Sequence, residues 1–165
     1  MGNNPLWKLS ATDLVKALRQ GELHPSETVE SAINRIEEVD GEVNELPIRC
    51  FERALDQANH LRLTDETKIL AGLPIVVKDY NDIGGVRTTY GSPIYANYIP
   101  ETSDATIQML ESRGAIPIAK SNVPEWAGGH TFNSVNGMTR NPWNLKRSAG
   151  GSSGCLLYTS DAADE

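Results

Sequence analysis

The strongest constraint on the fold is a pair of short apolar segments separated by a helical pattern. Residues 73–77 (Leu-Pro-Ile-Val-Val) and 115–119 (Ala-Ile-Pro-Ile-Ala) have the length and β-branched content of buried strands. Residues 103–113 between them have the pattern of a helix that Gly114 would end. A strand, a crossover helix and a second strand predict an α/β unit with parallel strands. Pro117 is unusual in a central strand, so it indicates the start of that strand or a local irregularity.

Helical patterns also fill the first 70 residues. In the second of these patterns, apolar residues recur at spacings of three and four, which predicts one buried stripe. The acidic residues of this region are typical of solvated helix faces. We expect one helix from Ser10 or Thr12 to about Gly21, a second from about Pro25 to Gly41, and a third over residues 51–63.

Charge and composition narrow the class of protein. The 165 residues include 15 basic and 22 acidic side chains, a formal net charge of −7, which argues against a nucleic-acid groove or an anionic membrane surface. No apolar run approaches the roughly 20 residues that span a bilayer, and the first residues lack the pattern of a secretory signal. The two cysteines and three histidines have no metal-ligand spacing, and the cysteines fit a reduced compartment. We therefore expect a cytoplasmic protein without a metal site.

Two features could carry chemistry: Lys78, at the end of the first apolar strand, and the glycine-serine loop at residues 148–154. This loop closes a long segment, residues 126–154, that is rich in Gly, Asn, Ser and Thr and predicts either a functional loop or disorder. A lysine that leaves a buried strand can lie in low dielectric, where desolvation favours its neutral, basic form. Such an amine can accept a proton from a hydroxyl, so serine and lysine can replace serine and histidine in acyl transfer. Each feature also has a simpler interpretation, a solvated strand end for the lysine and a flexible linker for the loop.

Other enzyme motifs fit the loop less well. Residues 150–154 satisfy Gly-x-Ser-x-Gly, the nucleophile elbow of α/β-hydrolases, but that elbow needs a strand before it and a histidine later in the chain. Residues 141–147 instead predict a polar turn, and no histidine follows. A phosphate-binding loop would need Gly-Lys-Ser or Gly-Lys-Thr after its glycines, which is absent. A Ser-His-Asp site that uses His130 stays open, although a lone loop histidine is usually structural or solvated.

An ordered set of motifs gives the lysine and the loop a common interpretation. Residues 72–79 (Gly-Leu-Pro-Ile-Val-Val-Lys-Asp) resemble the lysine strand of the amidase signature family, and residues 150–154 (Gly-Gly-Ser-Ser-Gly) resemble its serine-glycine signature. The matches follow the order and spacing of the family across about residues 10–154. The resemblance implies an α/β amidase-signature fold, a mixed β-sheet flanked by helices, of which this chain holds the N-terminal portion. Further matching segments are residues 82–92, 104–106, 114–125 and 141–144.

The resemblance implies a Ser–Ser–Lys triad that acts on carboxylic amides, with no metal or organic cofactor. Lys78 matches the general base of the family. Ser152 matches the bridging serine, which relays protons and is usually reached through a cis peptide bond. Ser153 matches a neighbouring serine that helps to hold the network. The residues whose backbone is expected to line the acyl side of the pocket are Ala127, Gly128 and Gly129.

The family pattern breaks after Gly154. The family continues with a small-residue helix and a glycine-rich strand end that carries the nucleophilic serine, whereas residues 155–165 have neither feature. We expect residues 1–154 to be the N-terminal part of one amidase-signature domain and residues 155–165 to be an artefactual tail. Ser160 comes too early and lacks flanking glycines, so we expect no nucleophile in this chain and no catalysis by the chain alone.

Three functions stay open at this point. The first is an amidase that takes a small-molecule amide and needs no nucleic acid or membrane. The second is the glutaminase-like subunit of a tRNA amidotransferase, which would need partner subunits. The third is a non-catalytic remnant of such an enzyme. The identity of the amide and the oligomeric state also stay open, a homo-oligomer included.

Overall fold

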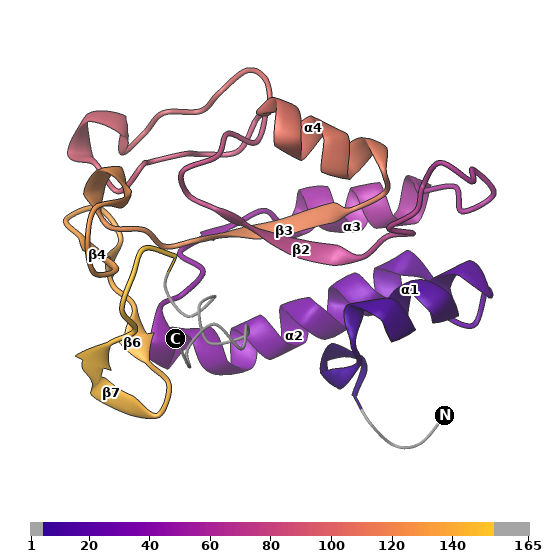
Figure 1. The fold of residues 1–165 in the computed structure, drawn as a ribbon, viewed down its shortest axis with the longest axis horizontal. Coiled ribbons are helices and arrows are strands. Elements are labelled where there is room, and N and C mark those ends of the chain that lie inside the picture. The colour runs from indigo at the N-terminus through magenta and orange to yellow at the C-terminus, as the bar shows by residue number, and fades with distance from the viewer. Residues whose placement is uncertain (1–4, 154–165) are drawn as a thin grey trace. The chain divides into compact units, whose positions relative to one another are not determined.

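The computed structural model describes residues 5–153 of the chain, so the tail predicted at residues 155–165 lies outside the described part. Internal contacts divide the chain into two compact units. Of the described residues, the first unit contains 5–38, 50–76 and 105–118, and the second contains 39–49, 77–104 and 119–153. Figure 1 follows the chain through its helices and strands.

The first unit consists of helices around an apolar core. Ser10 caps the first helix as predicted, since its hydroxyl accepts a hydrogen bond from the Asp13 amide at 3.1 Å. The second helix buries its predicted stripe, which includes Val29, Ile33 and Ile36. The helices of this unit are η1 (Leu6–Lys8), α1 (Ala11–Arg19), most of α2 (Pro25–Val43), α3 (Phe51–His60) and α4 (Ala105–Ser112).

Two of the predicted helix ends are wrong. α2 does not stop at Gly41 but continues to Val43, because a helix tolerates one glycine at a cost of about 1 kcal/mol. It ends where Asn44 takes a left-handed conformation (φ 57°) and the buried Asp40 carboxylate accepts the next two backbone amides. α3 ends at His60, sooner than the predicted end at residue 63.

The two predicted strands lie side by side and run parallel. At their start the Ile116 amide donates to the Leu73 carbonyl at 2.9 Å, and at their end the Asp79 amide donates to the Ser121 carbonyl at 3.0 Å. A third strand pairs antiparallel with the middle one, so the sheet is mixed, as the family resemblance implied. The strands are β1 (Ile48–Arg49), β2 (Pro74–Lys78) and β3 (Ile116–Ser121), in the sheet order β1-β3-β2.

Pro117 is the second residue of the central strand β3, which agrees with its predicted place near the start of that strand. The pairing of β3 with β1 begins only at Ala119, which lies opposite Arg49. A proline before that point therefore removes no donor from the pairing with β1.

The second unit contains short strands where sequence analysis expected a loop without regular structure. Two small antiparallel hairpins form after β3, and in the first of them Phe132 pairs with Met138. Three of these strands have two residues, too few to show an apolar alternation, and the five residues of β7 are almost all polar and exposed, so the sequence pattern did not reveal them. The remaining elements of this unit are η2 (Pro93–Tyr95), η3 (Glu125–Ala127), β4 (Phe132–Asn133), β5 (Gly137–Met138), β6 (Arg140–Asn141) and β7 (Asn144–Ser148).

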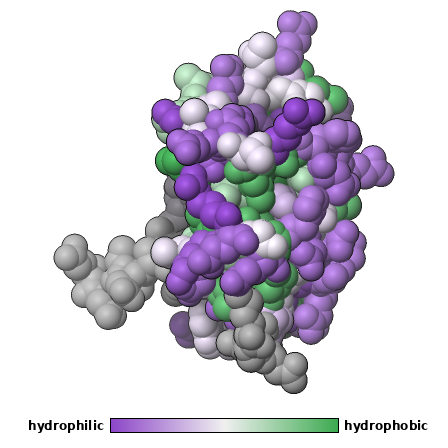
Figure 2. Space-filling model, turned by 90° about the vertical axis from the view of Figure 1, so that its right-hand side faces the viewer, coloured by the Kyte–Doolittle hydropathy of each residue, from purple (hydrophilic) through white to green (hydrophobic). Residues whose placement is uncertain are grey.

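The surface carries both hydrophilic and hydrophobic side chains. Figure 2 shows one face on which hydrophilic residues predominate and hydrophobic residues fill areas between them. The large apolar side chains exposed within residues 5–153 include Ile94 (81%) and Trp143 (76%). No helix within residues 5–153 has the length and apolar character needed to cross a membrane.

Candidate active site

The structure brings Lys78 and Ser152 together. Lys78 is the last residue of β2, and Ser152 lies in the loop that follows β7. The Lys78 amine (Nζ) donates a hydrogen bond to the Ser152 hydroxyl (Oγ) at 2.7 Å. The peptide bond between Gly151 and Ser152 is cis, and Ser153 is half-buried beside it in the chain. The amine and the hydroxyl therefore lie within the distance that direct proton transfer between them requires.

The environment of Lys78 favours its neutral form. The side chain is half-buried, and burial lowers the pKa of the Lys78 amine because desolvation penalises the charged state. A carboxylate beside it would act in the opposite direction. The ion pairs found among residues 5–153 do not include Lys78. Its half-burial and lowered pKa agree with the low-dielectric setting predicted for Lys78, whereas its role as a general base stays a prediction.

The segment predicted to line a pocket, residues 127–129, lies against the serine loop. A methyl group added at Gly151 would come within 1.8 Å of the Gly129 carbonyl oxygen, so only glycine fits there. The Thr131 amide also donates to the Gly150 carbonyl at 2.6 Å, which joins the two segments. Their contact with a substrate, like the role of the neighbouring serine, stays a prediction.

A buried asparagine connects the end of β3 to the serine loop. Asn122 is fully buried, and its side-chain nitrogen donates to the Gly137 carbonyl and the Thr139 hydroxyl at 3.1 Å each. Its side-chain oxygen accepts a hydrogen bond from the Asn133 side chain at 2.8 Å. The Thr139 carbonyl in turn accepts the amide of Ala149 at 3.0 Å. A continuous set of hydrogen bonds therefore extends from β3 to the residues just before Ser152.

Sequence analysis missed a second lysine near Lys78 in the sheet. Lys120 is fully buried in β3, and its amine lies 3.1 Å from the carboxylate of Asp79, which is also fully buried. Lys120 also donates to the Thr88 hydroxyl, while Asp79 accepts both the hydroxyl and, at 3.0 Å, the amide of Thr89. The sequence contained a signal for this ion pair. Asp79 directly follows β2 and Lys120 lies near the end of β3, so the two charged residues stand at the same end of neighbouring parallel strands.

An aromatic cluster adjoins residues 127–129 along the chain. Tyr90 stacks on Trp126 with ring centroids 5.8 Å apart, and Tyr95 meets both rings edge-on. The Tyr90 hydroxyl donates to the Asp82 carboxylate at 2.8 Å. Burial, together with this hydrogen bond, raises the pKa of the Tyr90 hydroxyl. These rings come from separate segments, so no local pattern in the sequence predicted the cluster.

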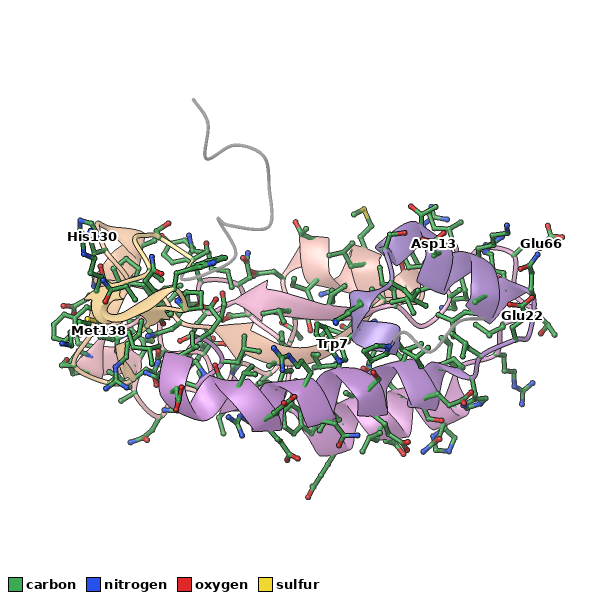
Figure 3. The ribbon with its side chains drawn as sticks, turned by 90° about the horizontal axis from the view of Figure 1, so that it is seen from below. Trp7, Asp13, Glu22, Glu66, His130 and Met138 are labelled. Carbon is green, nitrogen blue, oxygen red and sulfur yellow. The ribbon has the colours of Figure 1, made fainter. Side chains whose placement is uncertain are left out.

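His130, the candidate for a Ser-His-Asp site, does not join one in the described part of the chain. Its side chain is exposed, in the hairpin region where Figure 3 labels His130 and Met138. Within residues 5–153 no hydrogen bond or ion pair connects its ring to an aspartate. The same residues contain no group of three His, Cys, Asp or Glu side chains arranged to hold a metal ion.

Comparison with known proteins agrees with the motifs and the fold. The sequence model of the Amidase family matches residues 27–155, so the chain belongs to this family, the amidase signature enzymes. It is 36% identical over 154 residues to the A subunit of the glutamyl-tRNA(Gln) amidotransferase of Persephonella marina. It is 40% identical over 156 residues to the corresponding subunit from Oleidesulfovibrio alaskensis. Each match covers 90% of this chain but only 32% and 31% of the relatives, so the chain spans about a third of their length.

Solved structures of amidase-signature enzymes share the fold. A structure of 6-aminohexanoate cyclic dimer hydrolase matches with a TM-score of 0.81 and 30% identity, over 92% of this chain and 31% of that one. Fatty acid amide hydrolase matches with a TM-score of 0.84 and 27% identity, over 90% of this chain and 27% of that one. The predicted fold class is confirmed.

Replacing Asn122 by alanine should destabilise the protein by about 1–3 kcal/mol, because the Thr139 hydroxyl and the Asn133 side chain would lose a buried partner. Thermal unfolding of the full-length protein that carries this sequence should show a fall in melting temperature of roughly 1–3 °C. Asn97→Ala, at an exposed position, is the matched control and should leave the melting temperature unchanged. Equal melting temperatures for the two variants would contradict the role given to Asn122.

Proposed function

We propose that the full-length protein carrying this sequence hydrolyses carboxylic amides to an acid and ammonia or an amine. The observation that carries this proposal is the 2.7 Å hydrogen bond between the Lys78 amine and the Ser152 hydroxyl. Membership of the amidase family supports it. The present chain supplies the base and the bridging hydroxyl, and the attacking serine is assigned to a part of the protein outside this sequence.

The proposed reaction moves protons along one path. Neutral Lys78 takes the proton of the Ser152 hydroxyl while Ser152 takes the proton of the attacking serine. The attacking oxygen adds to the amide carbonyl, and the proton returns along the same path to the leaving nitrogen as the C–N bond breaks. Water then enters the same relay and cleaves the acyl-enzyme ester, which releases the acid and restores the serine. Ser153 helps to hold the hydroxyls, and residues 127–129 line the acyl side.

Lys78→Ala in the full-length protein should abolish amide hydrolysis, with a loss of at least about 1,000-fold in kcat, because the proton path would lose its base. The measurement is ammonia release from a simple amide, with folding checked by circular dichroism. Lys16→Ala, at an exposed position in α1, is the control and should keep full activity. Turnover by a correctly folded Lys78→Ala enzyme would refute the proposed lysine base.

The pH dependence of kcat/KM should follow the ionisation of Lys78. Burial lowers the pKa of the Lys78 amine, so the population of the neutral form rises at pH values below the usual lysine pKa of about 10.4. Activity should therefore fall as the pH drops through a midpoint that lies below this value. Lys78→Arg should be inactive at every pH, since arginine stays protonated. An acid limb at or above the ordinary lysine pKa would contradict the assignment.

A second candidate function is that of an amidotransferase A subunit, and the names of the relatives at 34–40% identity favour it. In this case glutamine would be the amide and partner subunits would be needed for full activity. The test compares ammonia release from glutamine and from an unrelated aliphatic amide by the purified full-length protein alone. We expect release from the aliphatic amide without partners. Release that appears only with glutamine and added partner subunits would favour the second candidate.

A further inference from the structure

The buried ion pair of Asp79 and Lys120 has no part in the proposed proton path. Both side chains are fully buried, and their charged atoms lie 3.1 Å apart. A buried ion pair is weak evidence for stability, because uncharged residues of similar volume often serve as well or better. The pair therefore calls for an explanation other than the stability of the fold.

We propose that Asp79 and Lys120 are positioning residues, which fix the end of β2 so that the Lys78 amine stays within hydrogen-bond distance of Ser152. This inference rests on the proposed function, since it gives the pair a role in that reaction. The pair touches neither the substrate nor the reacting atoms. It acts only through the backbone that carries Lys78.

The contacts around Asp79 hold the peptide next to Lys78 from several sides. The Asp79 amide donates to the Ser121 carbonyl at 3.0 Å, and the Lys78 carbonyl accepts the amide of Asn81 at 3.0 Å. The Asp79 carboxylate is bound by Lys120 and also by the amide and the hydroxyl of Thr89. Because the backbone and the side chain of Asp79 are both fixed, the long lysine side chain before it starts from a fixed point.

The same network extends toward the serine side of the site. The Thr89 hydroxyl, which donates to Asp79, accepts a hydrogen bond from the Asn136 side chain at 3.2 Å. Asn136 lies between β4 and β5, and its amide donates to the Asn133 side chain at 2.6 Å. Asn133 bonds to Asn122, whose partner Thr139 leads to the serine loop. The ion pair thus belongs to one set of hydrogen bonds that reaches both members of the proposed relay.

The test uses the full-length enzyme and the double variant Asp79→Asn/Lys120→Met, which removes both charges at similar volume. We expect kcat to fall by about 10- to 100-fold with KM changed by less than about three-fold, because a displaced base slows the chemical step more than binding. A fluorophosphonate probe, which labels the attacking serine with loss of fluoride, separates the two effects. The final extent of labelling counts folded sites and should match wild type, whereas the labelling rate should fall with kcat.

The matched control removes another ion pair, Arg53–Glu111 in the first unit, whose charged atoms lie 2.6 Å apart. Arg53→Met/Glu111→Gln should leave kcat and the labelling rate within about two-fold of wild type, since its pair does not hold the lysine strand end. A fall in kcat equal to that of the first double variant would overturn the inference, because it would make the effect one of general stability.

Other outcomes separate the inference from the proposed function. Wild-type kcat in Asp79→Asn/Lys120→Met, with an inactive Lys78→Ala enzyme, would overturn the positioning role and leave amide hydrolysis standing. An active Lys78→Ala enzyme would overturn the proposed function itself. If the double variant does not fold, Thr89→Val decides, because it loosens the Asp79 carboxylate without changing a charge. A kcat loss of at least about three-fold at full final labelling supports the inference, and an unchanged kcat overturns it.

Discussion

The hydrogen bond between the Lys78 amine and the Ser152 hydroxyl forms only if both residues are held in place, and the rest of the second unit holds them. One of its ends stands on a strand, whose backbone is held by the sheet. The other end stands on a loop with no regular structure, which must be fixed by other means. Gly151 supplies part of that support, because it packs against the carbonyl oxygen of Gly129. Hydrogen bonds that join the buried residues Thr131 and Thr139 to the loop supply the rest. The geometry of the pair is therefore a property of a network and not of two residues alone.

The two units are stabilised in different ways. The first buries aliphatic side chains between helices, and its stability follows from apolar area. The second buries many polar side chains, and each described one takes part in hydrogen bonds that specify one arrangement, apart from the Ser121 hydroxyl and one Glu45 oxygen. Such networks hold short strands and loops in place where apolar packing alone would leave alternatives. The buried polar residues are Thr88, Thr89, Ser92, Lys120, Asn122, Thr131, Asn133 and Thr139, with Asp40, Glu45, Asp79 and Ser121.

Sequence analysis predicted the elements whose signal is local. The strands β2 and β3, the helix between them and the Ser10 cap of α1 all follow from periodicity and from residues with strong end preferences. The pairing of Lys78 with Ser152 came from the family resemblance, because no local rule joins residues so far apart in the chain. The hairpins after β3 gave no signal, since three of their strands have only two residues and the five residues of β7 lack an apolar alternation. The passage of α2 through Gly41 was missed because the true end depends on the side chain of Asp40, which lies inside the helix.

Two lysines of the same sheet lie in different electrostatic surroundings. Lys78 and Lys120 lie near the same end of neighbouring parallel strands, and both are removed from water to some degree. Asp79 decides between them, because its fully buried carboxylate pairs with Lys120 and not with the half-buried lysine that precedes it. Successive residues at a strand end point to opposite faces, so the side chains of Lys78 and Asp79 point in opposite directions. A carboxylate beside Lys78 would stabilise the ammonium form and oppose the work of a base, whereas burial without a counter-charge lowers the pKa of that amine. The direction of the Asp79 side chain thus gives Lys120 a counter-charge inside the protein. It also leaves Lys78 outside the ion pairs found within residues 5–153, as the proposed role of Lys78 as a base requires.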